Sequence, residues 1–304
     1  MEEIFRIESI SQLNTLLNRD KLKHPQVCIV DLSAPFDKQY KNSKIVTGFY
    51  SVFLKGKNCS RLRYGHQNYD FEEGTMVFIG PEQVVEMEDD DDDEMEEAGK
   101  SWGLFFHPDL LKGTSLSTTI KSYSFFSYNS NEALHLSDKE REIVSEIIDK
   151  INYELSQNID KHTQTLIVSN IELLLNYCSR FYDRQFITRS VGNIDILSRF
   201  ESFLSEYYQS GSLKEKGLPT VKMCADKLNL TPNYLSDLLK KETGKNAREH
   251  IQYFLIEEAK NKLLISNETI SQIAFALGFE YPQHFSKVFK KHTGYTPVEY
   301  RNLN

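Results

Sequence analysis

The sequence predicts an α+β protein of two domains, with short β-strands in its first half and only helices in its last hundred residues. Its 304 residues exceed the usual size of one domain, and 39% apolar content is enough to fill ordinary cores. In the first half, β-branched and aromatic runs alternate with turn residues. In the last hundred residues, one helical pattern occurs twice. The division into two halves rests on these two patterns.

The first half begins with a short helix and continues as strands. Ser9 is placed to cap a helix that runs through Leu17. Many short strands at the observed spacing predict a small antiparallel barrel or jelly roll over residues 1–136. The expected strands are Val27–Asp31, Ile45–Leu54, Ser60–Tyr64, Thr75–Ile79 and Trp102–Phe106.

Two amphipathic helices are expected in a connector over residues 137–190. Ser137 and Glu140 have the spacing of a capping box, and isoleucines repeat on one face from there to Leu155. A second apolar stripe runs from His162 to Arg184. Such a pair is suited to a dimer interface and equally suited to packing on the barrel, so both interpretations stay open.

The last domain is expected over residues 193–304. Gly192 and Asn193 are expected to end the connection. Ile194–Tyr208 has the apolar spacing of a helix, and the turn residues of 209–219 predict a loop.

One pattern then occurs twice between residues 221 and 301. Ala225 and Ala274 are 49 positions apart, whereas Gly244 and Gly294 are 50 apart, so one residue has been inserted at the turn between them. A register shared over about twenty residues, with a single slip at a loop, is typical of a duplicated supersecondary unit.

Each copy has the signals of a helix-turn-helix, over about residues 220–242 and 269–292. Threonine starts each leading helix, with a capping box from Thr269 to Gln272 in the second copy, and Pro232 and Pro282 start the trailing helices. Apolar residues line one face of each trailing helix, which leaves the opposite face polar. That polar face carries Asn233, Ser236, Asp237, Lys240 and Lys241 in the first copy and Gln283, Ser286, Lys287, Lys290 and Lys291 in the second.

We expect these ten side chains to contact the major groove of DNA. The alternative is a plain helical bundle with solvated lysines, which is less able to explain two copies in register. A continuous helix is expected between the copies, over residues 247–264, and 18 residues of helix span about 27 Å. Two recognition helices held that far apart could enter successive major grooves, which repeat every 34 Å or so on one side of a duplex.

The last hundred residues resemble the AraC/XylS family of bacterial transcription factors. The resemblance rests on three segments at the family's spacing: Ile273–Phe279, Phe285–Lys291 and Gly294–Arg301. It implies a seven-helix domain of two helix-turn-helix units that binds promoter DNA. It also implies RNA polymerase as a partner if the protein is an activator, and an amino-terminal cupin-like barrel that senses a small molecule or pairs two chains in a homodimer.

Three positions depart from the family's pattern. Leu255 stands where the connecting helix usually has arginine, Asp237 stands where a basic residue is common, and His284 replaces a common tyrosine. The first two changes remove positive charge from the first unit. We therefore expect the second helix-turn-helix to anchor nonspecific affinity, and the first either to contribute selectivity or to remain conditional on the acidic amino-terminal half.

The acidic residues are concentrated in one block. From residue 190 onward there are 15 Lys plus Arg against 13 Asp plus Glu, whereas the first 189 residues hold 21 against 31. Ten of those acidic residues lie between Glu86 and Glu97. A block of one sign is ordinarily solvated and poorly ordered. The sharper hypothesis is that it repels DNA or masks the basic helices until a signal moves it.

The barrel offers few residues for chemistry. If it encloses a pocket, Tyr50, Arg63, Tyr64 and Trp102 are candidate wall residues, although core packing explains the aromatic ones equally well. Metal-dependent cupins use two histidines one residue apart, and the sequence has no such pair. We therefore expect no metal, no cofactor and no catalysis. A cupin-type small-molecule-binding protein or metal enzyme with an associating helical domain is the alternative.

The chain is expected to act in the cytoplasm. Its first residues lack the basic start and apolar run of a signal peptide, and no stretch approaches the twenty or so apolar residues of a membrane span. The four cysteines, Cys28, Cys59, Cys178 and Cys224, lack metal-site spacing and are expected to be reduced thiols.

Overall fold

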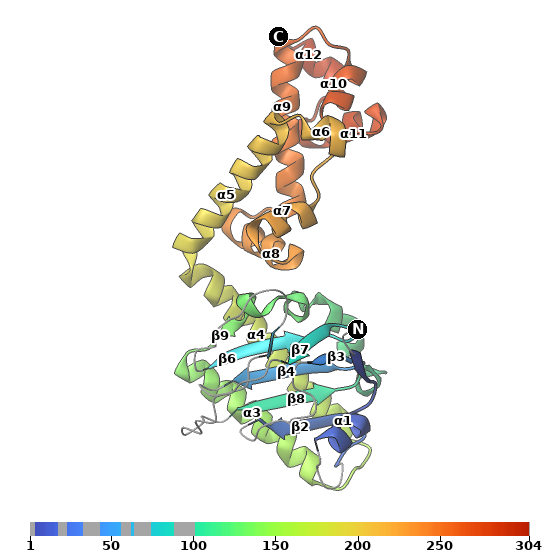
Figure 1. Ribbon diagram of the computed structural model, residues 1–304, viewed down its shortest axis with the longest axis vertical. Helices are drawn as coiled ribbons and strands as arrows, with labels where there is room; N and C mark the ends of the chain where they lie inside the picture. The colour runs from blue at the N-terminus through green and yellow to red at the C-terminus, as the bar shows by residue number, and fades with distance from the viewer. Residues whose placement is uncertain are drawn as a thin grey trace. The chain divides into compact units, whose positions relative to one another are not determined.

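The computed structural model describes residues 4–17, 23–32, 43–55, 62–63, 74–87 and 101–303. Their contacts divide the chain into two compact units, Met1–Gln185 and Phe186–Asn304 (Figure 1). Residues 88–97 of the acidic block, Tyr64 and Cys59 lie outside the described residues, and of Arg63 the structure describes only the backbone.

The first unit contains two β-sheets. The four-stranded sheet has the order β1-β3-β7-β5, with β1 parallel to β3 and the other neighbours antiparallel. Its strands are β1 (Ile4–Ile7), β3 (Ser43–Thr47), β7 (Val84–Met87) and β5 (Leu62–Arg63). The five-stranded sheet has the order β2-β8-β4-β6-β9 and is antiparallel throughout. Its strands are β2 (Val27–Asp31), β8 (Trp102–Phe106), β4 (Tyr50–Lys55), β6 (Thr75–Ile79) and β9 (Leu134–His135).

The expected antiparallel sheet structure is present, but the described residues form no closed barrel. The single strand expected over residues 45–54 is instead two strands in different sheets, because Gly48 and Phe49 interrupt the strand. Gly48 N donates to Ile7 O at 2.9 Å, and a Cβ on Gly48 would lie 3.2 Å from Glu8 O. Only glycine leaves room for this close approach, which ends β3 and lets β4 begin in the other sheet.

One core cluster joins both sheets on their shared side. It includes Ile45 and Val85 of the first sheet and Phe53 and Phe105 of the second. Helix α1 (Ile10–Leu16) contributes Ile10 and begins at the expected Ser9, whose side chain forms a capping box with Gln12.

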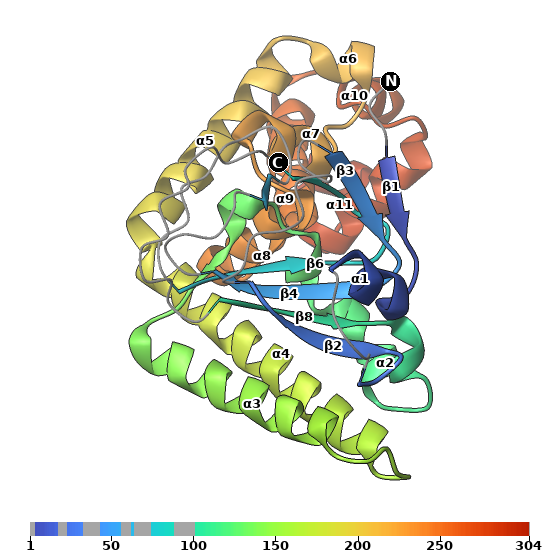
Figure 2. The same ribbon diagram turned by 60° about the horizontal axis from the view of Figure 1, so that its bottom comes forward.

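Two long helices cover the other face of the five-stranded sheet. Cys178 Sγ lies 4.0 Å from Met76 Sδ of β6, and the ring of Tyr182 lies 6.1 Å from that of Phe78. Both helix residues belong to α4 (Thr163–Thr188), and α3 (Asp138–Ser156) runs beside it (Figure 2). The apolar stripes expected in this pair are therefore largely buried within the first unit.

Short helical segments connect β8 to β9: η2 (Pro108–Leu111), α2 (Leu116–Thr119), η3 (Ile120–Ser122), η4 (Ser124–Ser127) and η5 (Ser130–Glu132).

The second unit is helical throughout its regular structure. Its helices are α5 (Ser190–Gln209), α6 (Ser212–Lys216), α7 (Val221–Leu228), α8 (Pro232–Thr243), α9 (Ala247–Ile265), α10 (Ile270–Ala276), α11 (Pro282–Thr293) and α12 (Pro297–Arg301). Two expectations differ from this. Gly192 and Asn193 lie inside α5 rather than before it, and the expected loop at 209–219 contains α6. The unit therefore includes residues before the expected boundary at 193.

Helix α9 is the shared spine of the second unit. Leu255 and Ile256 are each 2% exposed, whereas Leu264 is 48% exposed. Helix α9 packs against α8, α10 and α11, so both copies of the repeat rest on it. Among the described residues, every helix is too short or too polar to cross a lipid bilayer.

Candidate nucleic-acid interface

The two leading helices begin in the same way. Thr220 Oγ1 accepts a hydrogen bond from Met223 N at 3.1 Å, and α7 follows. Thr269 Oγ1 accepts from Gln272 N at 3.2 Å, while Gln272 Oε1 accepts from Thr269 N at 2.7 Å. The capping box predicted for the second copy is confirmed, and the side-chain cap satisfies amide groups that a helix start leaves unpaired.

The two turns close with the same hydrogen bonds. Leu230 N donates to Ala225 O, and Phe279 N donates to Ala274 O, both at 3.0 Å. The residue before each donor is left-handed, with φ of 57° at Asn229 and 81° at Gly278. Asparagine and glycine are the residues that adopt this region most readily, so both sequences permit one turn geometry.

The inserted residue lies between the second turn and α11. In the first copy, Thr231 is 8% exposed and its hydroxyl caps α8 by accepting from Tyr234 N at 3.2 Å. In the second copy, Tyr281 occupies the N-cap position with no side-chain cap and is 63% exposed. The extra residue therefore replaces a buried cap with an exposed ring at the start of α11.

The trailing helices bury the apolar face expected for each. Leu235 and Leu239 of α8 are fully buried, as are Phe285 and Phe289 of α11. All ten residues singled out for DNA contact lie on the remaining faces. Exposed among them are Asn233, Lys240, Lys241, Gln283, Lys287, Lys290 and Lys291, and half-buried are Ser236, Asp237 and Ser286.

A family model described as a helix-turn-helix domain matches residues 224–303. Residues 224–303 form an AraC-type helix-turn-helix domain. The AraC-type domain thus includes α8, α9, α10, α11 and α12, together with most of α7.

Curated relatives share this domain. The chain is 40% identical over 83 residues to the uncharacterized HTH-type transcriptional regulator YobQ of Bacillus subtilis, covering 27% of this chain and 34% of that protein. It is 37% identical over 92 residues to the uncharacterized transcriptional regulatory protein YesN of the same organism, covering 29% and 25%. The matches therefore span about a third or less of these two relatives.

A solved structure shows the same extent of similarity. The carboxy-terminal domain of the two-component response regulator yesN from Fusobacterium nucleatum is 29% identical, with a TM-score of 0.30, and the match covers 34% of this chain and 93% of that chain.

Sequence reasoning missed two cations in the first half of the AraC-type domain. Lys245 Nζ lies 4.0 Å from the centre of the Tyr253 ring, and Arg248 is exposed in the first turn of α9. The equivalent positions of the second half are Tyr295 and Val298. Residues 220–250 hold six Lys plus Arg against four Asp plus Glu, and residues 269–301 hold four against two, so both copies carry +2. Counting beyond the trailing helices would have shown this balance.

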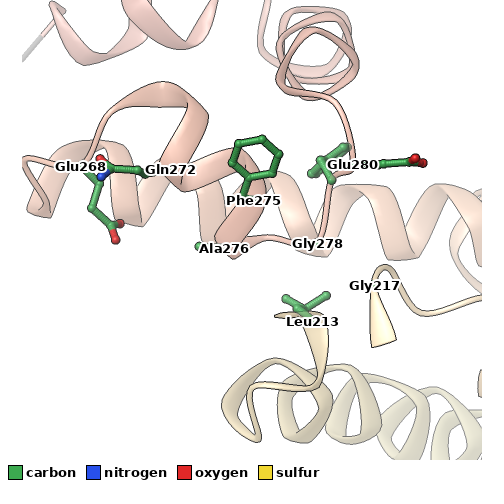
Figure 3. A pocket seen from close by; sticks show the side chains of 9 residues that line it. Leu213, Gly217, Glu268, Gln272, Phe275, Ala276, Gly278 and Glu280 are labelled. Carbon is green, nitrogen blue, oxygen red and sulfur yellow. The ribbon is translucent and has the colours of Figure 1, made fainter. Parts of the chain in front are cut away.

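A groove of about 630 Å³ lies beside the second half of the AraC-type domain, away from the ten candidate DNA-contact side chains of α8 and α11. Figure 3 shows Glu268 and Glu280 at opposite ends of the groove, with Phe275 between them and Leu213 facing it from α6. None of the ten residues lines the groove. Carboxylates at both ends of the groove disfavour phosphate binding there.

Of the candidate wall residues, Tyr50 and Trp102 lie on the face of the five-stranded sheet that α4 covers. The Tyr50 ring stacks on Phe106 at 5.2 Å and meets Phe126 edge-on at 4.9 Å, and burial raises the pKa of Tyr50. Trp102 is 7% exposed, and its Nε1–H is buried without an acceptor among the residues that the structure describes. Because β4 and β8 pair with Leu54 opposite Trp102, the two candidate rings lie at opposite ends of this strand pair.

The remaining histidine and cysteine side chains have structural surroundings. His107 Nδ1 accepts from Asp109 N at 3.1 Å and caps η2, whereas His66 lies outside the described residues. Burial raises the pKa of the Cys178 thiol and raises that of Cys224 to about 12, which keeps both protonated and unreactive. Within the described ranges, no three His, Cys, Asp or Glu side chains are grouped closely enough to bind a metal.

Proposed function

We propose that the protein is a sequence-specific transcription regulator that inserts α8 and α11 into successive major grooves of promoter DNA. One observation carries the proposal. The two trailing helices, α8 and α11, have the same construction, both pack on α9, and both leave a polar face exposed. Both copies have threonine-capped leading helices, the same turn hydrogen bonds and buried apolar faces. A helical bundle without a DNA partner also exposes polar faces to water, but it is less able to explain two copies in register.

The length of α9 supports simultaneous insertion. Its 19 residues span about 28 Å of helix. Successive major grooves on one side of a duplex repeat every 34 Å or so. A spine of this length can hold two recognition helices near that repeat without requiring a sharp DNA bend.

We assign base reading and phosphate contact to different side chains. Amide and hydroxyl groups near the start of each trailing helix suit base edges: Gln283 and Ser286 in α11, with Lys287, and Asn233 and Ser236 in α8. Lysines in the last turns suit phosphate, which binds every sequence alike.

Site selection from a random-sequence duplex library tests the proposal. The full chain should enrich one motif with two half-sites. On the selected duplex, Gln283→Ala should lower discrimination at particular bases by roughly 1–3 kcal/mol, whereas Lys290→Ala should weaken selected and scrambled duplexes alike. Enrichment of no motif would contradict the regulator, and equal loss on both duplexes with Gln283→Ala would remove its base-reading role.

We infer further that the first unit is a cupin-like module that senses a small molecule or pairs two chains. Leu166 and Leu173 support pairing, because they are 44% and 41% exposed and lie one heptad apart on α4, away from its buried stripe. The double variant Leu166→Glu with Leu173→Glu should convert a dimer to a monomer in light scattering. Thr165→Glu, also exposed on α4, is the matched control. A dimer that survives the double variant would exclude this surface.

The proposed activity is binding rather than catalysis, exercised inside the cell where the promoter is. Transcription in vitro with RNA polymerase, on a template carrying the selected motif, distinguishes an activator from a repressor. Addition of the protein should raise or lower transcript yield only on that template.

A further inference from the structure

A buried asparagine ties the start of α5 to the first trailing helix. Asn193 is 2% exposed, and its Nδ2 donates to Phe186 O at 2.6 Å and to Glu242 Oε1 at 2.7 Å. A carbonyl and a carboxylate can only accept, so both partners require the amide nitrogen to face them. Phe186 lies in the last turn of α4, and Glu242 lies in the last turn of α8.

A second contact holds the other end of α8 to the same segment. The Phe186 ring lies 5.2 Å from that of Tyr234, with exposures of 4% and 5%. Tyr234 is in the first turn of α8 and Glu242 in its last. Residues 186–193, which we call the junction segment, therefore contact α8 near both of its ends.

The second trailing helix lacks this attachment at the equivalent positions. His284 corresponds to Tyr234 and His292 to Glu242 in the repeat, and both histidines are exposed. Helix α11 packs instead through its own Phe285 and Phe289, which lie close to Phe279 and Tyr300 respectively. The junction segment is thus specific to the first helix-turn-helix.

We propose that Asn193 is a positioning residue for DNA reading. Through Glu242 it fixes the orientation of α8, so that Asn233 and Ser236 meet the base edges of one half-site. The inference rests on the proposed function, because it assigns α8 one half-site and α11 the other. It predicts that disturbing the junction segment lowers base discrimination in one half-site only.

The principal test replaces the donor with an acceptor of nearly equal shape. Asn193→Asp places a carboxylate against Phe186 O and Glu242, so both hydrogen bonds are lost. On the selected duplex, discrimination between the preferred and mismatched bases should fall about fivefold to tenfold in the α8 half-site, which is within the range for the net contribution of a typical intramolecular hydrogen bond. Discrimination in the α11 half-site should stay unchanged, and amide exchange should accelerate in α8 but not in α11.

Two matched variants separate this effect from charge and from misfolding. Ser198→Asp adds the same charge at an exposed position of α5 and should change neither ratio. Combining Asn193→Asp with Glu242→Gln lets the new amide donate to the new carboxylate, and it should recover part of the lost discrimination. Ratios measured within one variant cancel any general change in affinity.

Glu242→Ala keeps the test decisive if Asn193→Asp fails to fold. Glu242 is half-buried, and its removal leaves the bond from Asn193 to Phe186 O in place. It should lower discrimination in the α8 half-site by about twofold to fivefold. Equal losses in both half-sites, or none in either, would overturn the positioning role. If the unaltered protein selects no motif, the proposed function fails instead.

Discussion

The two helix-turn-helix units share their local structure but differ in what holds them. The threonine caps of the leading helices, the turns and the glycine ends of the trailing helices match, and each copy carries +2. The first trailing helix is attached to the junction segment through Tyr234 and Glu242. The second helix-turn-helix is held at its turn, where Gly278 faces Leu213 and Gly217. The comparison teaches that duplicated sequences keep the residues that set backbone geometry and diverge where each copy meets different neighbours.

The largest expected effect is on stability and comes from the aromatic core of the second helix-turn-helix. Phe289 is fully buried, and its ring lies 5.6 Å from that of Phe285 and 5.4 Å from that of Tyr300. Phe289→Ala should lower the free energy of unfolding by about 3–5 kcal/mol. Leu239→Ala at the equivalent position should cost less, because it removes a smaller side chain. Urea denaturation of both variants measures the two losses of unfolding free energy. A larger loss for Leu239→Ala than for Phe289→Ala would contradict the prediction.

The next effect tests how closely the second turn is packed. A Cβ on Gly278 would lie 3.1 Å from Leu213 O in a left-handed residue, so Gly278→Ala combines backbone strain with crowding. We expect a loss of about 2–3 kcal/mol in the free energy of unfolding. Gly244→Ala is the matched control, because Gly244 has φ of 79° and nothing within 4 Å of its Cβ position. Equal losses would mean that strain alone matters at Gly278.

Exchanging the charge at Asp237 and Lys287, the one equivalent pair among the ten candidate DNA-contact residues that differs in charge, should produce a smaller effect. Asp237 and Lys287 are equivalent in the repeat. Asp237→Lys should strengthen binding to a scrambled duplex and steepen the dependence of log affinity on log salt by about one unit, whereas Lys287→Asp should do the opposite. Fluorescence anisotropy across salt concentrations measures both slopes. Because the net charges of the copies are equal, the two changes should be similar in size.

The smallest effect is a pH dependence confined to the first half of the AraC-type domain. His250 occupies the position equivalent to Tyr300, and burial, assisted by Lys245, lowers its pKa despite Glu201 and Glu249. The unfolded chain therefore binds the proton more readily, so the free energy of unfolding should fall as pH drops below about 6.5 toward the folded pKa. The loss should stay under about 1 kcal/mol because the ring is partly exposed.

The matched variant for this effect is His250→Tyr, which introduces the residue found at the equivalent position, Tyr300, in the second half of the AraC-type domain. The difference in unfolding free energy between the two proteins should change between pH 7.5 and pH 5.5, conditions that bracket the histidine's ordinary value. A constant difference would show that His250 does not contribute to acid sensitivity.

The sequence by itself determined the repeat, the caps and the polar faces of the trailing helices. Helix starts are local, since Thr269 and Gln272 satisfy one another within a single turn, and the apolar period fixes which face is free. The same local signals predicted α1 at Ser9 and α3 at Ser137.

Only the tertiary structure decided how the strands divide between two sheets and which residues hold α8. Gly48 ends β3 because of its approach to Glu8, and Asn193 is recognised as a clamp only when Phe186 and Glu242 are brought beside it. These contacts join positions distant in the chain, and neither leaves a periodic signal. Their effect depends on which atoms meet after folding, whereas caps and amphipathic faces depend on neighbours a turn away.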